Sequence, residues 1–150
     1  MNIGIIGSGG REHSICYWIK KSKKVKKIFC FPGNAGTDDI AENINIDPNN
    51  FKKLNNFILK KNIQILIVGP EEPLVNGVVD FFEKRGIKIF GPNKLASKLE
   101  GSKIFTKKLC KKYNIPTANF KICNSKKNAF EFLSECKFPL VVKADGLAAG

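Results

Sequence analysis

The sequence predicts an α/β fold, a Rossmann-like parallel sheet with flanking helices, over its first hundred residues. Short apolar runs of strand length alternate with longer stretches of helical periodicity. The clearest run, residues 63–68, is almost wholly apolar, as in strands buried on both faces of a parallel sheet. A glycine-rich turn at residues 7–10 joins the first run to the first helical stretch. This alternation is typical of βαβ units with parallel strands.

The first hundred residues are expected to contain strands and helices in alternation. The expected strands end at turns rich in glycine, proline or asparagine, which are residues that interrupt regular structure. We expect strands at residues 3–6, 25–31, 43–46, 63–68 and 87–90. We expect helices at residues 11–21, 49–61, 75–85 and 94–99, and Gly86 is expected to cap the third of these.

A break at Glu100 and Gly101 marks the expected domain boundary, which leaves residues 1–100 in one domain and residues 101–150 in the beginning of another. Ser102 can cap a helix that starts there. In this second part we expect helices at residues 103–113 and 127–136, strands at 119–123 and 140–144, and a second glycine-rich loop at 145–150. A ligand loop at the very end of the chain suggests a fragment of a longer protein.

The turn at residues 7–10 has the composition of a phosphate-binding loop. Gly7, Gly9 and Gly10 allow a tight turn and a close approach of an anion to the backbone. The helix that follows presents free N–H groups and the positive end of its dipole. Arg11 adds a fork of donors that suits a phosphate or a carboxylate. The alternatives are a plain strand-to-helix turn and a surface ion pair of Arg11.

Two further turns are expected beside this loop, at residues 32–37 and 69–74. Parallel strands end at the same edge of a sheet, so the turns that follow them meet there. Gly33 and Asn34 are candidates for contacts with a sugar, or for a plain turn. Glu71 offers a carboxylate for hydroxyl or amine groups, although a carboxylate near a helix start is favoured by the dipole alone.

A dinucleotide is disfavoured as the ligand of these turns. A dinucleotide-binding loop has a third glycine and an acidic residue at the end of the second strand. Here Glu12 stands where the third glycine belongs, and the second expected strand ends in Pro32, Gly33 and Asn34. Glu12 is interpreted either as a structural partner of the loop or as a substrate contact.

Composition narrows the class of protein further. The formal charge is +13, but many lysines come as scattered pairs, which favours a solvated surface over a nucleic-acid-binding patch. No apolar run approaches the roughly 20 residues of a membrane span, and the start lacks the pattern of a secretory signal. The five cysteines form no CxxC pair, which disfavours zinc and favours reduced thiols. These features predict a cytoplasmic protein without nucleic-acid or membrane partners.

Seven segments, in order along the chain, resemble the phosphoribosylamine–glycine ligase family of the ATP-grasp superfamily. They are GSGGREH (7–13), PGNAGT (32–37), VGPEEPLVNGVVD (68–80), IFGP (89–92), LEGSKIFTK (99–107), IPTA (115–118) and VVKADGLAAG (141–150). GGREH together with PGNAGT is typical of this ligase rather than of ATP-grasp enzymes at large. The resemblance implies the N-terminal domain of the ligase followed by the start of its ATP-grasp domain.

The resemblance implies an activity and a set of binding residues. The reaction is ATP-dependent joining of glycine to 5-phosphoribosylamine, through a glycyl phosphate, to give 5-phosphoribosylglycinamide in purine biosynthesis. The residues implied for 5-phosphoribosylamine are Gly9, Gly10, Arg11, Glu12, Gly33, Asn34 and Glu71. Those implied for ATP are Lys103, Lys143, Asp145, Gly146 and Gly150. Lys143 also stands out by itself, because a lone charge ending an apolar strand is costly to bury without an anion.

The implied cofactors are ATP and Mg²⁺ or Mn²⁺, with the metal ligands expected beyond residue 150 and no catalytic residue assigned within the chain. We expect a monomer that acts on small molecules, and no ligase activity from this chain alone. Two alternatives stay open. The chain is a non-catalytic domain that binds a phosphorylated ligand, or it is the N-terminal domain of another ATP-grasp carboxylase or ligase.

Overall fold

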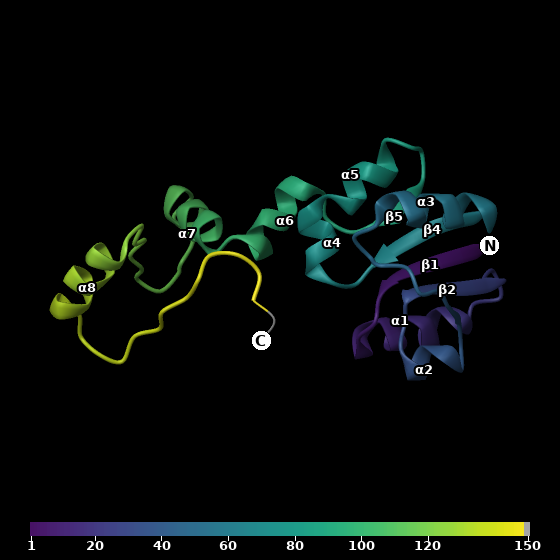
Figure 1. Ribbon diagram of the computed structural model, residues 1–150, viewed down its shortest axis with the longest axis horizontal. Helices are drawn as coiled ribbons and strands as arrows, with labels where there is room; N and C mark the ends of the chain where they lie inside the picture. Colours follow the sequence, from purple (N-terminus) through teal and green to yellow (C-terminus); the bar gives the residue numbers. More distant parts are fainter. Residues whose placement is uncertain (149–150) are drawn as a thin grey trace. The chain divides into compact units, whose positions relative to one another are not determined.

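The computed structural model describes residues 1–148 and divides the chain into two compact units, Met1–Ser97 and Lys98–Gly150. We call them unit 1 and unit 2. Unit 1 contains a sheet with helices on both faces, whereas the regular structure of the described part of unit 2 is helical (Figure 1). The division falls inside helix α6 (Lys94–Gly101).

The described residues form one five-stranded parallel sheet with the strand order β3-β2-β1-β4-β5. Its strands are β1 (Asn2–Gly7), β2 (Lys27–Pro32), β3 (Glu42–Asn43), β4 (Ile63–Val68) and β5 (Lys88–Phe90). Ile5 of β1 pairs with Cys30 of β2 on one side and with Ile67 of β4 on the other. The chain runs outward from β1 first to one side and then to the other. Ligands of open parallel sheets bind at such a point of reversal, beyond the carboxyl ends of the strands.

Helices cover both faces of this sheet (Figure 1). On one face lie α1 (Gly10–Lys20) and α2 (Ala35–Asp38), and on the other lie α3 (Phe51–Lys60) and α5 (Val78–Glu83). A hydrophobic core lies on each face of the sheet. Alternate residues of β1 belong to one core or the other, since successive strand side chains point to opposite faces. Ile3 and Ile5 pack with Cys16 of α1, while Ile6 belongs to the core that holds Leu54 and Phe82.

Several elements of unit 1 differ from the sequence prediction. The helix expected at 75–85 is two helices, α4 (Glu71–Asn76) and α5, because Gly77 adopts a left-handed φ of 93° that breaks the helix. The short helix α2 was not expected, and β3 is shorter than the expected strand at 43–46.

Unit 2 holds helices α7 (Lys103–Lys112) and α8 (Lys126–Glu135), and none of its described residues is buried. The strands expected at 119–123 and 140–144 are absent from the described residues, so that prediction is wrong. A strand is stable only where a neighbour accepts and donates its backbone hydrogen bonds, and neither segment has one. Val141 and Val142 remain 78% and 80% exposed.

Helices long and apolar enough to cross a membrane were sought throughout the described part of the chain, and none was found.

Candidate functional site

Three turns meet at the carboxyl end of β1. The amide of Gly33 donates to the carbonyl of Gly7 at 3.1 Å, and the amide of Gly69 donates to the carbonyl of Ile6 at 3.0 Å. The turns after β1, β2 and β4 are therefore joined by backbone hydrogen bonds. This is the arrangement expected from parallel strands that end at one edge.

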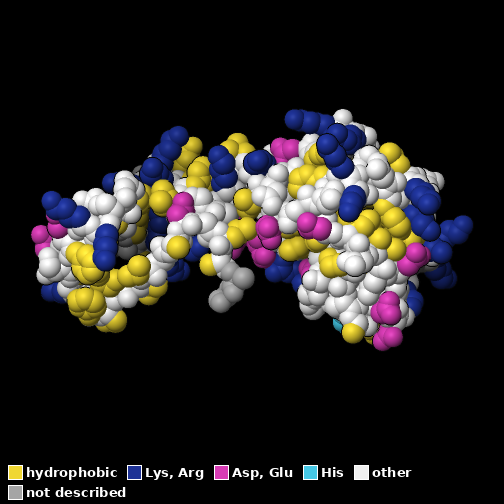
Figure 2. Space-filling model, in the orientation of Figure 1, with side chains coloured by type: hydrophobic (Ala, Val, Ile, Leu, Met, Phe, Trp, Pro, Cys, Tyr) yellow, Lys and Arg dark blue, Asp and Glu magenta, His cyan; other side chains and the backbone are white. Residues whose placement is uncertain are grey.

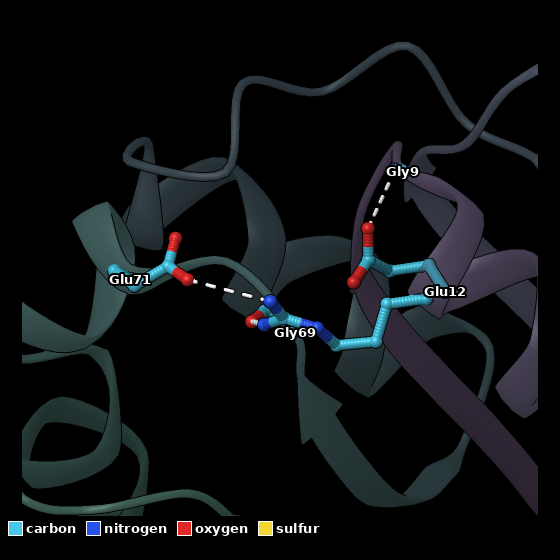
Figure 3. A network of polar contacts seen from close by, with 5 residues as sticks. Gly9, Glu12, Gly69 and Glu71 are labelled. Carbon is cyan, nitrogen blue, oxygen red and sulfur yellow. Dashed lines mark hydrogen bonds and ion pairs between the residues drawn. The ribbon is translucent and has the colours of Figure 1, made fainter. Parts of the chain in front are cut away.

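Glu12 fills the space between the first and third turns (Figure 3). Its side chain is only 4% exposed, and its Oε2 accepts a 2.5 Å hydrogen bond from the amide of Gly9. A Cβ on Gly7 would lie 2.7 Å from the Glu12 carboxyl carbon, and a Cβ on Gly69 would lie 2.5 Å from it. The two glycines thus leave room for the carboxylate. Glu12 supports the loop from the position that a third glycine has in dinucleotide-binding folds.

Arg11 connects the glycine loop to the turn after β4. Its Nη1 donates to the carbonyl of Gly69, and its Nη2 lies 3.4 Å from Oε1 of Glu71 (Figure 3). The side chains of Arg11 and Glu71 are 62% and 47% exposed, so this ion pair contributes at most about 1 kcal/mol to stability. A guanidinium has five N–H donors, and these two contacts leave others for a ligand.

A cleft of about 500 Å³ opens beside these residues within unit 1. Its walls are the glycine loop at residues 7–12, the segment 47–49 and the segment 70–73. The amides of Gly10 and Arg11 belong to the first turn of α1, where no preceding turn supplies a carbonyl for them. The cleft therefore combines backbone donors and a guanidinium suited to an anion.

Carboxylates also line the cleft. They are Glu12, Asp47, Glu71 and Glu72. Apart from the buried Glu12, these groups can accept hydrogen bonds from hydroxyl groups or bind an amine. A ligand that carries a phosphate at one end and hydroxyl or amine groups at the other matches both kinds of wall.

Gly33 and Asn34 lie behind the glycine loop rather than on the wall of the cleft. The Asn34 amide nitrogen donates to the carbonyls of Ser8 and Gly9 at 2.9 and 3.1 Å, which ties the second turn to the first. Gly33 has a left-handed φ of 78°, and a Cβ there would lie 2.5 Å from the Asn43 side-chain carbonyl carbon. Both residues thus brace the loop.

The segment 47–49 was not singled out from the sequence, although it forms one wall of the cleft. Its Asp47 side chain accepts from the amide of Asn49 at 2.9 Å, which stabilises a turn before α3. Its position along the chain could have identified this segment as part of the site. It follows an expected strand of the same parallel sheet and so lies at the same edge as the other turns.

Three of the residues implied for ATP come together at the start of α7 in unit 2. Oδ1 of Asp145 lies 3.1 Å from the amide of Ile104 and 3.1 Å from the Ser102 hydroxyl, and both groups donate to it. The Ile104 amide, followed by the Ser102 hydroxyl, holds the pKa of Asp145 below its ordinary value. The Lys103 ammonium donates to the carbonyl of Gly146 at 2.6 Å.

The other two residues implied for ATP are not part of this arrangement. Lys143 is exposed and belongs to no strand, so the expectation of a charge ending a buried apolar strand is wrong. The strand that would have buried it has no neighbour to pair with. Gly150 lies outside the described residues.

No group of three or more metal-ligating side chains that could hold an ion occurs among residues 1–148. The described cysteines are all free thiols. Cys16 of α1 and Cys30 of β2 are buried together, with their sulfur atoms 3.2 Å apart. Their contact and their burial raise the pKa of the Cys30 thiol.

The fold and the cleft define a class of protein. An open parallel sheet with a glycine loop, a helix N-terminus and an arginine at its carboxyl edge is the architecture of α/β domains that bind phosphorylated ligands. Comparison with protein families makes this specific. Residues 1–100 match the family described as phosphoribosylglycinamide synthetase, N domain, and residues 101–150 match its ATP-grasp (A) domain. The chain belongs to the phosphoribosylglycinamide synthetase family, and the resemblance seen in the sequence is confirmed.

Individual relatives agree with this assignment. The phosphoribosylamine–glycine ligase of Caldanaerobacter subterraneus is 50% identical over 150 residues, which is all of this chain and 36% of that protein. The crystal structure of phosphoribosylamine–glycine ligase from Thermotoga maritima matches with a TM-score of 0.76 and 32% identity, over all of this chain and 34% of that one. The chain thus spans about a third of the length of the relatives it matches.

A more distant neighbour shares the fold alone. The biotin carboxylase domain of 2-oxoglutarate carboxylase from Hydrogenobacter thermophilus, solved with MgADP, ADP and bicarbonate, has a TM-score of 0.65 and 17% identity. The match covers 92% of this chain and 33% of that one. It confirms the predicted α/β architecture.

Proposed function

We propose that this chain supplies the 5-phosphoribosylamine-binding part of a phosphoribosylamine–glycine ligase. The observation that carries the proposal is the cleft beside the glycine loop, in which backbone donors and Arg11 face the same space as Glu71. In this assignment the phosphate lies at the first turn of α1 and on Arg11. The ribose hydroxyls and the amine lie against the carboxylates of the opposite wall.

The remaining predicted residues take supporting roles in the proposal. Gly9 and Gly10 provide the close backbone approach, while Glu12, Gly33 and Asn34 keep the loop in shape from behind. These three residues act on the ligand through the backbone that they position. All of these residues belong to unit 1. We propose a monomer that acts on small molecules.

Residues 101–150 are proposed to begin the ATP-grasp domain. Lys103 at the start of α7 and the loop at Asp145 and Gly146 would hold the phosphates of ATP, because ammonium groups pair with phosphate oxygens. ATP supplies the phosphoryl group that activates the glycine carboxylate. The described residues contain no group of three or more side chains placed to hold Mg²⁺, so the metal ligands are expected in the part of the longer relatives that this chain does not span.

The full reaction is proposed to be the joining of glycine to 5-phosphoribosylamine with ATP, in the cytoplasm and within purine biosynthesis. We expect this chain alone to show no ligase activity, because it offers no metal site in its described residues. Incubation with 5-phosphoribosylamine, glycine, ATP and Mg²⁺ tests this directly. Formation of 5-phosphoribosylglycinamide would contradict the expectation.

Binding of ribose 5-phosphate, a stable sugar phosphate, tests the cleft. We expect Arg11→Ala to weaken its binding about 10- to 100-fold, because a hydrogen bond to a charged group contributes about 1.5–3 kcal/mol. Arg85→Ala is the matched control, since it removes the only other arginine of the chain and that residue does not line the cleft. Isothermal titration calorimetry on both variants decides the matter. Equal losses, or no binding by the unaltered chain, would overturn the assignment of the phosphate to Arg11.

A further inference from the structure

Eight lysines gather at the amino edge of the sheet, opposite the cleft. They lie in the connections that lead from α1 to β2 and from α3 to β4, and at the ends of the helices and of the strand β2 that adjoin these connections. We call this surface the basic edge, and its members are Lys20, Lys21, Lys23, Lys24, Lys26, Lys27, Lys60 and Lys61. Figure 2 shows dark blue side chains along the end of unit 1 where β1 begins, on the right of the view.

Hydrogen bonds of the first two residues place both connections beside the start of β1. The Met1 ammonium donates to the carbonyl of Lys24 at 2.6 Å, and the amide of Lys26 donates to the carbonyl of Met1 at 2.8 Å. On the other side of β1, the side-chain Nδ2 of Asn2 donates to the carbonyl of Lys61 at 2.8 Å. Since paired strands lie about 4.8 Å apart, the connections that flank β1 start about 10 Å apart. That separation is about one Debye length at 0.1 M salt, so an anion near one connection is still attracted by the charges of the other.

No lysine of the basic edge forms an ion pair in the described part of the chain. The described residues form two ion pairs, Arg11 with Glu71 and Lys127 with Glu131, and neither involves a lysine of this edge. Residues 13–37 and 48–70, which contain all eight lysines, include no aspartate or glutamate. The positive potentials of these ammonium groups add up, and the edge therefore attracts an anion that carries several charges.

Two exposed aromatic rings adjoin the lysines. Tyr17 and Trp18, on the last two turns of α1, are 49% and 65% exposed, and their ring centres are 5.6 Å apart. The Lys21 ammonium lies 4.2 Å from the centre of the Tyr17 ring and 3.8 Å from that of Trp18. Exposed aromatic rings beside a track of cations are what proteins use to bind single-stranded nucleic acid, with bases stacked on the rings and phosphates on the lysines.

We propose that the basic edge, together with Tyr17 and Trp18, binds single-stranded nucleic acid. A flexible strand can follow lysines that project from two separate connections, whereas these short connections offer no helix to enter a duplex groove. Binding at this edge is sequence-tolerant because it rests on phosphates and on stacking. The basic edge lies at the amino ends of the strands, whereas the cleft lies at their carboxyl ends. This proposal therefore does not depend on the ligand of the cleft.

Fluorescence anisotropy with a labelled oligouridine RNA tests the proposal on the whole chain. If four phosphates are contacted, the affinity should fall about 50-fold when the salt is raised from about 50 to about 200 mM. Stacking should also quench the fluorescence of Trp18, which is the only tryptophan of the chain. Absence of binding at the lower salt concentration would overturn the proposal.

Two variants of equal charge separate the basic edge from general lysine content. In the first, four lysines of the edge become glutamine, namely Lys23, Lys24, Lys26 and Lys27. In the control, four exposed lysines of unit 2 become glutamine, namely Lys108, Lys111, Lys112 and Lys121. We expect at least a tenfold loss of RNA affinity for the first variant and less than a twofold loss for the control, with unchanged circular dichroism for both. Equal losses would refute a specific edge.

The aromatic part of the proposal has its own test. Trp18→Leu should lower RNA affinity about tenfold, because stacking of one base contributes about 1–3 kcal/mol. Retention of full affinity would remove Trp18 from the site.

A membrane surface is the competing partner. If the chain binds phosphatidylserine vesicles and leaves RNA unbound, the nucleic-acid proposal is overturned.

Discussion

Replacement of Gly69 by alanine tests whether the Glu12 carboxylate really occupies the space between the turns. A Cβ at position 69 would lie well inside van der Waals contact of Glu12 Oε1 and 2.5 Å from its carboxyl carbon. Two responses are open to the protein. Either the backbone shifts, at the cost of overpacking, about 1–3 kcal/mol, or Glu12 rotates away and loses its hydrogen bond from Gly9, about 1.5–3 kcal/mol.

Both responses lead to a loss of about 2 kcal/mol in the free energy of unfolding. Urea unfolding followed by far-ultraviolet circular dichroism would detect it, because a slope of about 1–2 kcal/mol per molar converts this loss into a midpoint shift of about 1–2 M. Gly10→Ala is the matched control. It adds the same methyl group with no atom within 4 Å, so we expect it to be neutral or slightly stabilising in the first turn of α1.

A double-mutant cycle isolates the contact. In the Glu12→Ala background the carboxylate is gone, and Gly69→Ala should then cost well under 1 kcal/mol, which gives a coupling energy of about 1–2 kcal/mol. If Gly69→Ala costs the same with and without Glu12, the clash is with something else. The reasoning about the turn would then be wrong.

Further predictions concern the thiols and unit 2. Cys16 and Cys30 are buried, so they should react with iodoacetamide far more slowly than the exposed Cys123, as mass spectrometry after short labelling would show; equal rates would contradict the packing of α1 on β2. Asp145 has a lowered pKa when folded, so its contacts stabilise the start of α7 at neutral pH and weaken as the pH falls through that lowered pKa. Carbon-detected NMR titration should find the pKa of Asp145 below 3.8, and Ser102→Ala should raise it. A pKa at the ordinary value in the unaltered chain would speak against the contacts.

The sequence was sufficient for the architecture of unit 1, and the reason is physical. Buried parallel strands such as residues 63–68 must be apolar on both faces, and the amphipathic stretch at 49–61 must place one face on the sheet. These demands leave a visible pattern. The meeting of the three turns could also be predicted, because parallel strands all end at the same edge of the sheet.

The roles of single residues were less accessible. Whether Glu12 supports the loop or contacts a ligand depends on which glycines lie beside its carboxylate, and Gly69 is far from it in sequence. The position of Asn34 behind the loop likewise depends on where its side chain finds carbonyl acceptors. Periodicity carries no information about such contacts.

The two wrong strand predictions have a common cause. Residues 119–123 and 140–144 have strand-like composition, but a strand requires a neighbour, which local sequence cannot supply. The lysine pairs illustrate the opposite effect. They look dispersed along the sequence, yet the topology brings the connections at 20–27 and 60–61 to the same end of the sheet.

The lack of any buried residue in the described part of unit 2 has a calorimetric consequence. The heat-capacity increment of unfolding comes mainly from apolar surface that is buried in the folded state. It averages about 12–15 cal/mol/K per residue in proteins with a full hydrophobic core. For Met1–Ser97 this gives about 1.3 kcal/mol/K, against about 2 kcal/mol/K for a fully packed chain of 150 residues. A thermogram of the chain should therefore resemble that of a protein two-thirds its length.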